Sequence, residues 1–275
     1  MLINDIARTL KPHLPVKIAD LLIFIYHRIY MNALCKYYEI KEKNDPDKLM
    51  LPSASLRYRV NGSPDIESFF DEGKKCKEDI MAALNSIGKD IETFENILDF
   101  GCGCGRTLRW FSEYTETSNF FGADIDCQAI EYCNNYLSNM KFITNNFVPP
   151  INFKDNTFDL IYSISVFTHI DEYHQYNWLE ELNRIATPDA VLLLSIHGET
   201  CWSKLPAKYK DEITKKGIVF VTDNIWDGIF PSGYQSTFHT KEYIFDNYSK
   251  YFKLLKYIPQ GISNFQDLVI LQKGA

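Results

Sequence analysis

The chain has 275 residues, 45% of them hydrophobic and 15% aromatic, which is enough for one substantial domain with an appendage. Its net charge of −7 provides no overall basic field, which argues against a nucleic-acid partner. Seven cysteines without paired CxxC spacing, and an amino terminus without the pattern of a secretory signal, predict free thiols and a cytoplasmic location.

Residues 1–50 are interpreted as a helical extension and a linker, and residues 51–275 as the main domain. The most apolar segment of the extension, 16–31, falls short of the roughly 20 apolar residues that span a bilayer. Four polar residues interrupt it: Lys17, Asp20, His27 and Arg28. We therefore expect no transmembrane span. We expect a helix that packs on the domain or on a second subunit, as in a homodimer, with peripheral membrane contact as the alternative.

A second helical pattern covers 63–88, where Ser63-Pro64 is a start signal and Gly88 a stop signal. From residue 96 onward, short apolar strands alternate with helical segments, a pattern typical of a mostly parallel sheet covered on both faces. The expected strands are 96–101, 119–125, 141–146, 158–164 and 190–197, and the expected helices are 105–115, 127–137 and 171–186. Two last strands, 252–259 and 266–273, suit an antiparallel hairpin at the sheet edge.

The stretch ILDFGCGCGRTLRW, residues 97–110, ends the first strand in three alternating glycines. Such a loop lets backbone approach a ligand closely. The dinucleotide pattern G-x-G-x-x-G is not met, because Arg106 or Leu108 stands at its third glycine, depending on the count. Cys102 and Cys104 cannot complete a four-ligand metal site alone. We interpret them as small residues that fill space between loop and sheet, and we expect no metal.

The spacing Asp99-x-Gly101-x-Gly103-x-Gly105 resembles motif I of the class I, Rossmann-like S-adenosylmethionine-dependent methyltransferases. In that family an acidic residue at the end of the second strand accepts hydrogen bonds from both ribose hydroxyls, and Asp124 stands at the matching position. Later segments resemble the fourth-strand motif and the fifth strand of the family. The combination of motifs is similar to a bacterial and archaeal group that is often associated with glycan or secondary-metabolite assembly.

The resemblance implies a three-layer α/β sandwich around a mostly parallel, seven-stranded sheet that ends in an antiparallel hairpin. It implies S-adenosylmethionine as cofactor and S-adenosylhomocysteine as product. The cofactor-binding residues that it implies are Asp99, Gly101, Cys102, Gly103, Gly105, Asp124, Ile125, Asn146, Phe147, Ser163, Ile164 and Arg59. The sequence departs from the family twice: Asn146 replaces an Asp that meets the adenine amine, and Pro188-Asp189-Ala190 replaces a Pro-Gly-Gly turn.

Similar methyltransferases often fold an N-terminal segment over the cofactor, which implies a lid at 52–88 and a core at 96–275. In such a lid, Arg57 or Arg59 would pair with the methionine carboxylate. Its apolar part would come from three aromatic residues: Tyr58, Phe69 and Phe70.

Transfer of a methyl group to a hydroxyl benefits from a general base. Three histidines are candidates for this base because they follow strands or precede a later helix: His169, His197 and His239. The alternative for each is a purely structural role. The sequence thus predicts a methyltransferase that acts on a small-molecule or saccharide acceptor, at oxygen. Methylation of a protein or a lipid-linked acceptor, and a catalytically silent S-adenosylmethionine-binding protein, stay open as alternatives.

Overall fold

The computed structural model describes residues 16–43, 50–205, 207–222 and 235–274. Residues 1–15 of the expected helical extension and residues 44–49 of the expected linker lie outside the described residues. Among the described residues, no helix has the length and apolar character that crossing a bilayer requires.

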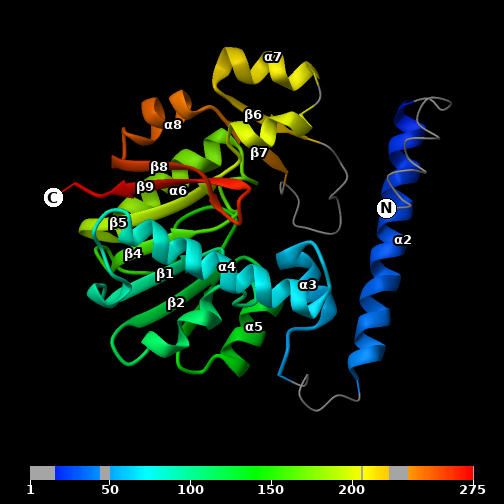
Figure 1. The fold of residues 1–275 in the computed structure, drawn as a ribbon, viewed down its shortest axis with the longest axis horizontal. Coiled ribbons are helices and arrows are strands. Elements are labelled where there is room, and N and C mark those ends of the chain that lie inside the picture. Colours follow the sequence, from blue (N-terminus) through cyan, green and yellow to red (C-terminus); the bar gives the residue numbers. More distant parts are fainter. Residues whose placement is uncertain (1–15, 44–49, 206, 223–234, 275) are drawn as a thin grey trace.

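A seven-stranded sheet forms the centre of the molecule (Figure 1). Its order is β3 (Lys141–Thr144), β2 (Asn119–Asp124), β1 (Asn96–Phe100), β4 (Phe158–Ser163), β5 (Ala186–Ile196), β9 (Gln266–Gln272) and β8 (Lys253–Ile262). The first five strands are parallel, and β9 runs antiparallel to both β5 and β8. The predicted fold class, including the final antiparallel hairpin, is confirmed.

Two separate apolar cores cover the two faces of this sheet. Side chains alternate between them along a strand, so that Ile97 belongs to one core and Leu98 to the other. One face is covered by α4 (Ile66–Asn85), α5 (Cys127–Tyr136) and the 3₁₀ segment η4 (Leu108–Tyr114). The other face is covered by α6 (Glu172–Ile185) and α8 (Lys241–Tyr248). Burial of both faces explains why the strands read as nearly continuous apolar runs.

Two N-terminal helices, α2 (Val16–Glu42) and α3 (Ala54–Asn61), lie outside these layers (Figure 1). They pack on each other through a small apolar cluster that contains Met31, Cys35 and Tyr58. The Arg57 guanidinium, only 1% exposed, pairs with Glu42 at 2.7 Å and donates to two backbone carbonyls. Arg57 therefore fixes α2 on α3 and is not available to a cofactor carboxylate.

Of the lid expected at 52–88, only α3 lies outside the layers of the domain, because α4 is packed into its core. Phe69 and Ile80 of α4 are fully buried in the core, and Phe70 packs against Trp110. Tyr58 faces α2. None of the three aromatic residues expected to cover the cofactor therefore does so in this structure.

Several elements differ from the sequence-based expectations. The segment 105–115 forms the 3₁₀ turns of η4 rather than an α-helix. Asp189 adopts a left-handed backbone (φ 63°), a conformation that Asp tolerates, and so replaces the glycine of the usual turn. The remaining elements are η3 (Ile91–Thr93), η5 (Glu199–Lys204), α7 (Ala207–Lys216) and a small antiparallel sheet of β6 (Ile218–Val221) and β7 (Ser236–His239).

Candidate functional site

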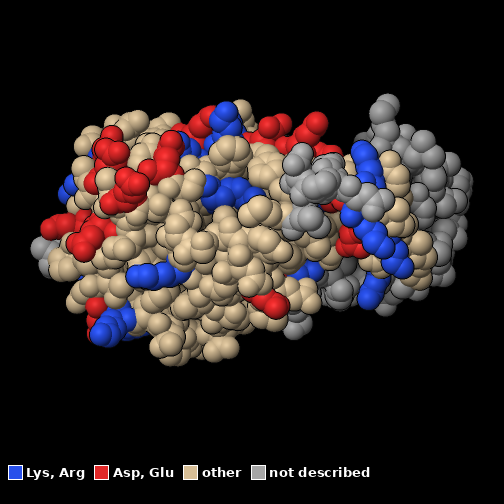
Figure 2. Space-filling model, turned by 90° about the horizontal axis from the view of Figure 1, so that it is seen from below, with Lys and Arg blue, Asp and Glu red and all other residues tan. Residues whose placement is uncertain are grey.

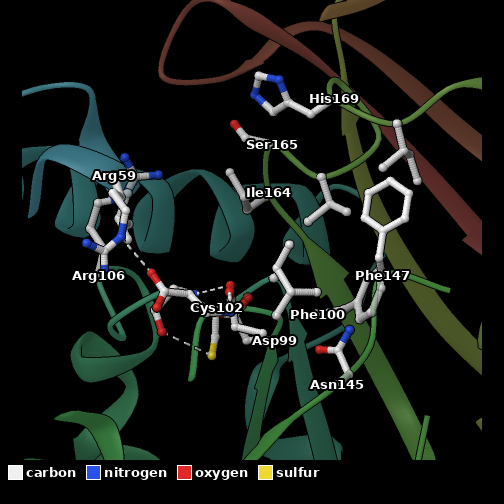
Figure 3. Close-up of a pocket in the computed structure, with 18 of the residues that line it drawn as sticks. Arg59, Asp99, Phe100, Cys102, Arg106, Asn145, Phe147, Ile164, Ser165 and His169 are labelled. Carbon is white, nitrogen blue, oxygen red and sulfur yellow. Dashed lines mark hydrogen bonds and ion pairs between the residues drawn. The ribbon is translucent and has the colours of Figure 1, made fainter. Parts of the chain in front are cut away.

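A cavity of about 440 Å³ lies at the carboxyl ends of β1, β2, β3 and β4. This is where open α/β sheets hold ligands, next to the strand at which the order reverses. Figure 3 shows Arg59 and Arg106 on one side of the cavity, Asn145 and Phe147 on another, and His169 near Ser165. The cavity is lined by ten of the residues expected to bind cofactor: Arg59, Asp99, Gly101, Cys102, Gly103, Asp124, Ile125, Asn146, Phe147 and Ile164. Gly105 and Ser163 are not in its lining.

The glycine loop follows β1 and bends through left-handed backbone conformations. Gly101 has φ 87° and Gly103 has φ 53°, which L side chains rarely adopt. A Cβ atom at Gly103 would lie 2.6 Å from the Val60 Cγ2 atom of α3. Gly105 has a different role, because a Cβ atom there would meet Leu137 at 2.5 Å. Two glycines therefore shape the cavity, and the third permits close packing on α5.

Asp124 at the end of β2 ties this loop to the next helix. One carboxylate oxygen accepts from the Gly103 N–H at 2.7 Å, and the other accepts from the Asp126 N–H at 2.8 Å. Burial raises the pKa of Asp124, while these backbone donors act in the opposite direction. A carboxylate has about four acceptor positions, so two stay available to hydroxyl donors in the cavity.

Asp99 is the buried acid of the site. Burial, with a smaller effect of the nearby Asp124 charge, raises the pKa of Asp99 to about 8. The Tyr162 hydroxyl and the Arg106 guanidinium lower it in part. At neutral pH a large share of Asp99 is therefore protonated, and a cation that enters the cavity would favour its ionised form.

Two arginines face the cavity, and they differ in how many of their donors are used. Arg59 donates to Asp126 at 2.7 Å, to Ser55 at 3.0 Å and to Gln128 at 2.9 Å, which anchors α3 to the start of α5. Arg106 donates from Nη1 to Asn61 at 2.8 Å. Its buried Nε–H has no hydrogen-bond partner in the described part of the chain.

Arg106 therefore differs from Arg59 in having one nitrogen, Nε, without a partner among the described residues, and sequence reasoning missed this residue. Its position directly after the glycine loop was the available signal.

The far side of the cavity carries an amide pair and an aromatic ring. Asn145 and Asn146 follow β3, and both line the cavity. The Asn145 Nδ2 donates to the Asn146 carbonyl at 2.8 Å, and its buried Oδ1 has no partner within the described ranges. The Phe147 carbonyl accepts from Trp178 Nε1 at 3.1 Å, which fixes this segment. Sequence reasoning selected Asn146 alone, and the structure adds its neighbour as an acceptor.

His169 is the only one of the three candidate bases in the cavity lining. Its Nδ1 lies 2.7 Å from the Gln235 carbonyl oxygen, which can only accept, so Nδ1 carries a proton. Burial, with a contribution from His197, lowers the pKa of His169 to about 3. The ring is therefore neutral at ordinary pH and carries its lone pair on Nε2.

The two other candidate histidines, His197 and His239, are not in the lining of the cavity. His239 is fully buried, and its Nε2 donates to Gln175 Oε1 at 3.0 Å. Burial lowers its pKa to about 3 as well. His197 is 8% exposed, lies 3.2 Å through Nδ1 from the Thr237 carbonyl, and stacks on Phe238. The structure thus assigns both residues to the packing of β7 on the main sheet.

Ser165 occupies the place in the cavity that was expected for Ser163. Ser163 is fully buried, whereas Ser165 lines the cavity in a left-handed conformation (φ 64°). The Ser165 N–H donates to Ser195 Oγ at 2.7 Å, and its hydroxyl accepts from Gln266 Nε2 at 2.7 Å. These two bonds fix an unusual backbone next to His169.

The two cysteines of the glycine loop are packed thiols. Cys102 is 4% exposed and Cys104 is fully buried. Burial raises the pKa of Cys102 well above its usual value and that of Cys104 to about 12, so both stay protonated. Protonated thiols are poor metal ligands, and both side chains fill the space between loop and sheet.

Comparison with known proteins identifies the domain that contains this cavity. Residues 97–189 match the family model of a methyltransferase domain. A solved structure from Pyrococcus horikoshii is similar, with 17% identity and a TM-score of 0.55 over 76% of this chain and 92% of that one. A Clostridium acetobutylicum S-adenosylmethionine-dependent methyltransferase has 13% identity and a TM-score of 0.51, covering 74% and 92%.

A further S-adenosylmethionine-dependent methyltransferase, from Mesorhizobium loti, has 13% identity and a TM-score of 0.51 over 71% of this chain and 98% of that one. At these identities the structural likeness shows a shared fold and no more. The family model, in contrast, identifies residues 97–189 as a methyltransferase domain. The glycine loop and the acidic residue at the end of β2 both lie within the matched residues 97–189. Residues 97–189 are therefore a methyltransferase domain, and S-adenosylmethionine is its cofactor.

Proposed function

We propose that this methyltransferase methylates an oxygen atom of a small-molecule or saccharide acceptor, with His169 as the general base. The observation that carries the proposal is the state of His169 in the cavity lining. Its Nδ1 proton is held by the Gln235 carbonyl, so the lone pair of the neutral ring is on Nε2. A neutral imidazole accepts a hydrogen bond from a hydroxyl and then its proton.

The cavity offers partners for each part of the cofactor. Asp124 would accept from the ribose hydroxyls, and Asn145 and Asn146 would accept from the adenine amine. Arg106 would pair with the methionine carboxylate, in place of Arg59, each of whose three nitrogens already donates one hydrogen bond. The unpartnered Arg106 Nε and Asn145 Oδ1, counted over the described residues, support this fit because each buried group needs a complementary atom. Bound there, S-adenosylmethionine supplies an activated methyl group.

The chain itself mainly aligns the acceptor and removes its proton. The acceptor hydroxyl would donate to His169 Nε2 and lose its proton as its oxygen gains the methyl group. Because the pKa of His169 is only about 3, the ring is a weak base, and proton transfer would accompany methyl transfer rather than precede it. Alignment would contribute the larger part of the acceleration.

The experiment is methyl transfer from tritiated S-adenosylmethionine to panels of hydroxylated small molecules and saccharides, with wild type and His169→Asn. We expect kcat to fall by about 10²- to 10⁴-fold in the variant, with cofactor affinity nearly unchanged. His174→Asn is the matched control, since His174 contacts Asp171 on α6 and is not in the cavity lining. Equal kcat in wild type and His169→Asn would contradict the assignment of the base.

Two alternatives make different predictions in the same assay. A protein or lipid-linked acceptor would take up label only when cell extract or membrane fractions replace the panels. A catalytically silent protein would bind S-adenosylmethionine in titration and transfer no label to any fraction.

A further inference from the structure

The α2 helix exposes a continuous apolar face. Four of the large apolar side chains that the described surface exposes are Ile25 at 43%, Ile29 at 65%, Tyr37 at 58% and Ile40 at 74%. Together with exposed Ala33, they recur every three or four residues and so form one stripe along the helix. Met31 and Cys35, which pack on α3, lie on the opposite side. The helix is therefore apolar on two faces, and only one of them is packed on this chain among the described residues.

Basic residues border this stripe. By helical spacing the exposed Lys36 and Lys43 lie along one edge of the stripe, and the exposed Arg28 lies beyond that edge, toward Cys35. Figure 2 shows a band of Lys and Arg atoms along α2. Of the two acidic residues in the described half of α2, Glu42 is paired with Arg57, which leaves Glu39. The surface around the stripe is thus locally positive on a chain whose net charge is −7.

A second cavity, of about 400 Å³, lies beside the stripe between α2 and α3. Three cationic side chains and one carboxylate line it: Arg28, Lys36, Arg59 and Glu39. Tyr58 also lines it, and its buried hydroxyl has no hydrogen-bond partner within the described residues. Burial raises the pKa of Tyr58 to about 12, so the hydroxyl keeps its proton and can donate. The three cations outnumber the Glu39 carboxylate, so together with the hydroxyl donor they suit a phosphate group.

We propose that α2 binds the surface of an anionic phospholipid bilayer, with the stripe in the acyl region and a headgroup phosphate in the cavity between α2 and α3. A second copy of the chain is the less suitable occupant, because two such faces would bring Lys36 and its basic neighbours together. A bilayer matches both the apolar stripe and its basic border. This binding goes beyond the proposed methyl transfer and does not depend on the acceptor.

The test is cosedimentation of the full chain with vesicles of phosphatidylcholine, alone or with about 30% phosphatidylglycerol. We expect partition to the anionic vesicles that weakens as salt is added. Ile29→Asp with Ile40→Asp should reduce partition about ten-fold or more, since both change the stripe. Arg28→Glu with Lys36→Glu should reduce partition to a similar extent, because the two substitutions replace positive charges with negative ones near an anionic surface.

Two control variants alter equally exposed residues elsewhere. Tyr173→Asp changes an apolar side chain on α6 that is 69% exposed, and Lys89→Glu reverses an exposed charge. Both should partition like wild type. Titration with S-adenosylmethionine reports in every variant whether the domain is folded, so a failure of binding to vesicles is distinct from a failure of the proposed function.

Three outcomes would overturn the proposal. The first is equal partition of wild type and the stripe variants. The second is a wild-type dimer in sedimentation equilibrium that the stripe variants dissociate, which would make a second copy the occupant. The third is saturable binding of inorganic phosphate, lost in the Arg28→Glu, Lys36→Glu variant, without partition to vesicles. The cavity would then serve a free phosphate compound.

Discussion

Asp124 joins three parts of the site through one carboxylate. It holds the Gly103 and Asp126 N–H groups and faces the cavity in which we place the ribose. Asp124→Ala should therefore lower S-adenosylmethionine affinity by about ten- to a hundred-fold, since hydrogen bonds to a charged group are worth about 1.5–3 kcal/mol. Isothermal titration measures this change.

Asp159 provides a matched control for that prediction. Its carboxylate also accepts from two backbone N–H groups, those of Glu95 at 2.7 Å and Asn96 at 2.9 Å, but at the other end of β1. Asp159→Ala should lower stability without changing cofactor affinity. Similar losses of affinity in both variants would mean that Asp124 acts only through the backbone it supports.

The buried Asp99 should make stability depend on pH. Its pKa of about 8 in the folded chain lies above the 3.8 of an exposed Asp. A raised pKa contributes stability that is fully present below pH 3.8 and is lost as the pH rises through 8. Asp99→Asn lacks this contribution, so between pH 5 and 8 the variant should gain stability relative to wild type, by about 1.4 kcal/mol for each pH unit. Urea unfolding of both proteins across that range measures the difference, and parallel curves would contradict the assignment.

At the scale of single residues, the sequence predicts those residues of the cavity whose position is determined by the backbone. Asp99, Gly101, Gly103 and Asp124 were identified because strand ends and glycine spacing determine where their backbone lies. It could not separate the three histidines, because His239 is part of β7 and His197 packs on β7, and a four-residue strand leaves almost no pattern. Arg106 and Asn145 were missed for a related reason. Each points into the cavity through a side-chain direction that spacing does not determine.

At the scale of elements, the glycine loop and α3 are in direct contact. A Cβ atom at Gly103 would lie 2.6 Å from Val60 Cγ2, so Gly103→Ala should displace α3 or the loop. We expect S-adenosylmethionine affinity to fall about ten-fold or more, and Val60→Ala in the same chain to restore part of it by removing the contact. Isothermal titration again measures both effects.

Gly88→Ala is the control for backbone strain. Gly88 has φ 72°, in the same left-handed region, and a Cβ atom there would meet nothing within 4 Å. Both alanine variants should lose about 1 kcal/mol of stability from the unfavourable φ. Only Gly103→Ala should lose cofactor affinity. If Gly88→Ala weakens binding equally, the effect is general destabilisation.

The 3₁₀ conformation of η4, where the sequence pattern predicts an α-helix, has a physical explanation. In η4 the fully buried residues Leu108 and Phe111 are three positions apart. Positions i and i+3 lie on one face in both the α-helix and the 3₁₀-helix, so this pattern cannot separate the two. Longer segments such as α4 and α6 contain enough turns for their period to be recognised, and their existence was predicted.

At the scale of the whole molecule, the sheet order brings the ends of β1, β2 and β3, where we propose that the cofactor binds, beside the end of β4, where we propose that the acceptor binds. The N-terminal helices complete the cavity from outside these layers, through Arg59 and Val60 of α3. Since α2 is fixed to α3 by the Arg57–Glu42 pair, the surface that we propose for membrane binding is coupled to the wall of the cofactor cavity. Movement of α3 would therefore change both the position of α2 and the shape of the cofactor cavity.

The last prediction concerns the motion of α3. A cofactor cavity must open for exchange of product, and α3 is joined to α5 by the Arg59 contacts and to the core by Leu56 and by the Arg106–Asn61 hydrogen bond. Residues 54–61 should therefore gain protection from hydrogen exchange when S-adenosylhomocysteine binds. Residues 66–85 should change little, because α4 is already packed in the core. Removal of residues 1–43 takes away Glu42 but leaves the Arg57 bonds to the Pro52 and Pro64 carbonyls, so α3 should exchange faster without ligand and still be protected with it. Ligand binding that leaves exchange in 54–61 unaltered would show that α3 is a rigid wall, and the cavity would then have to open through another segment.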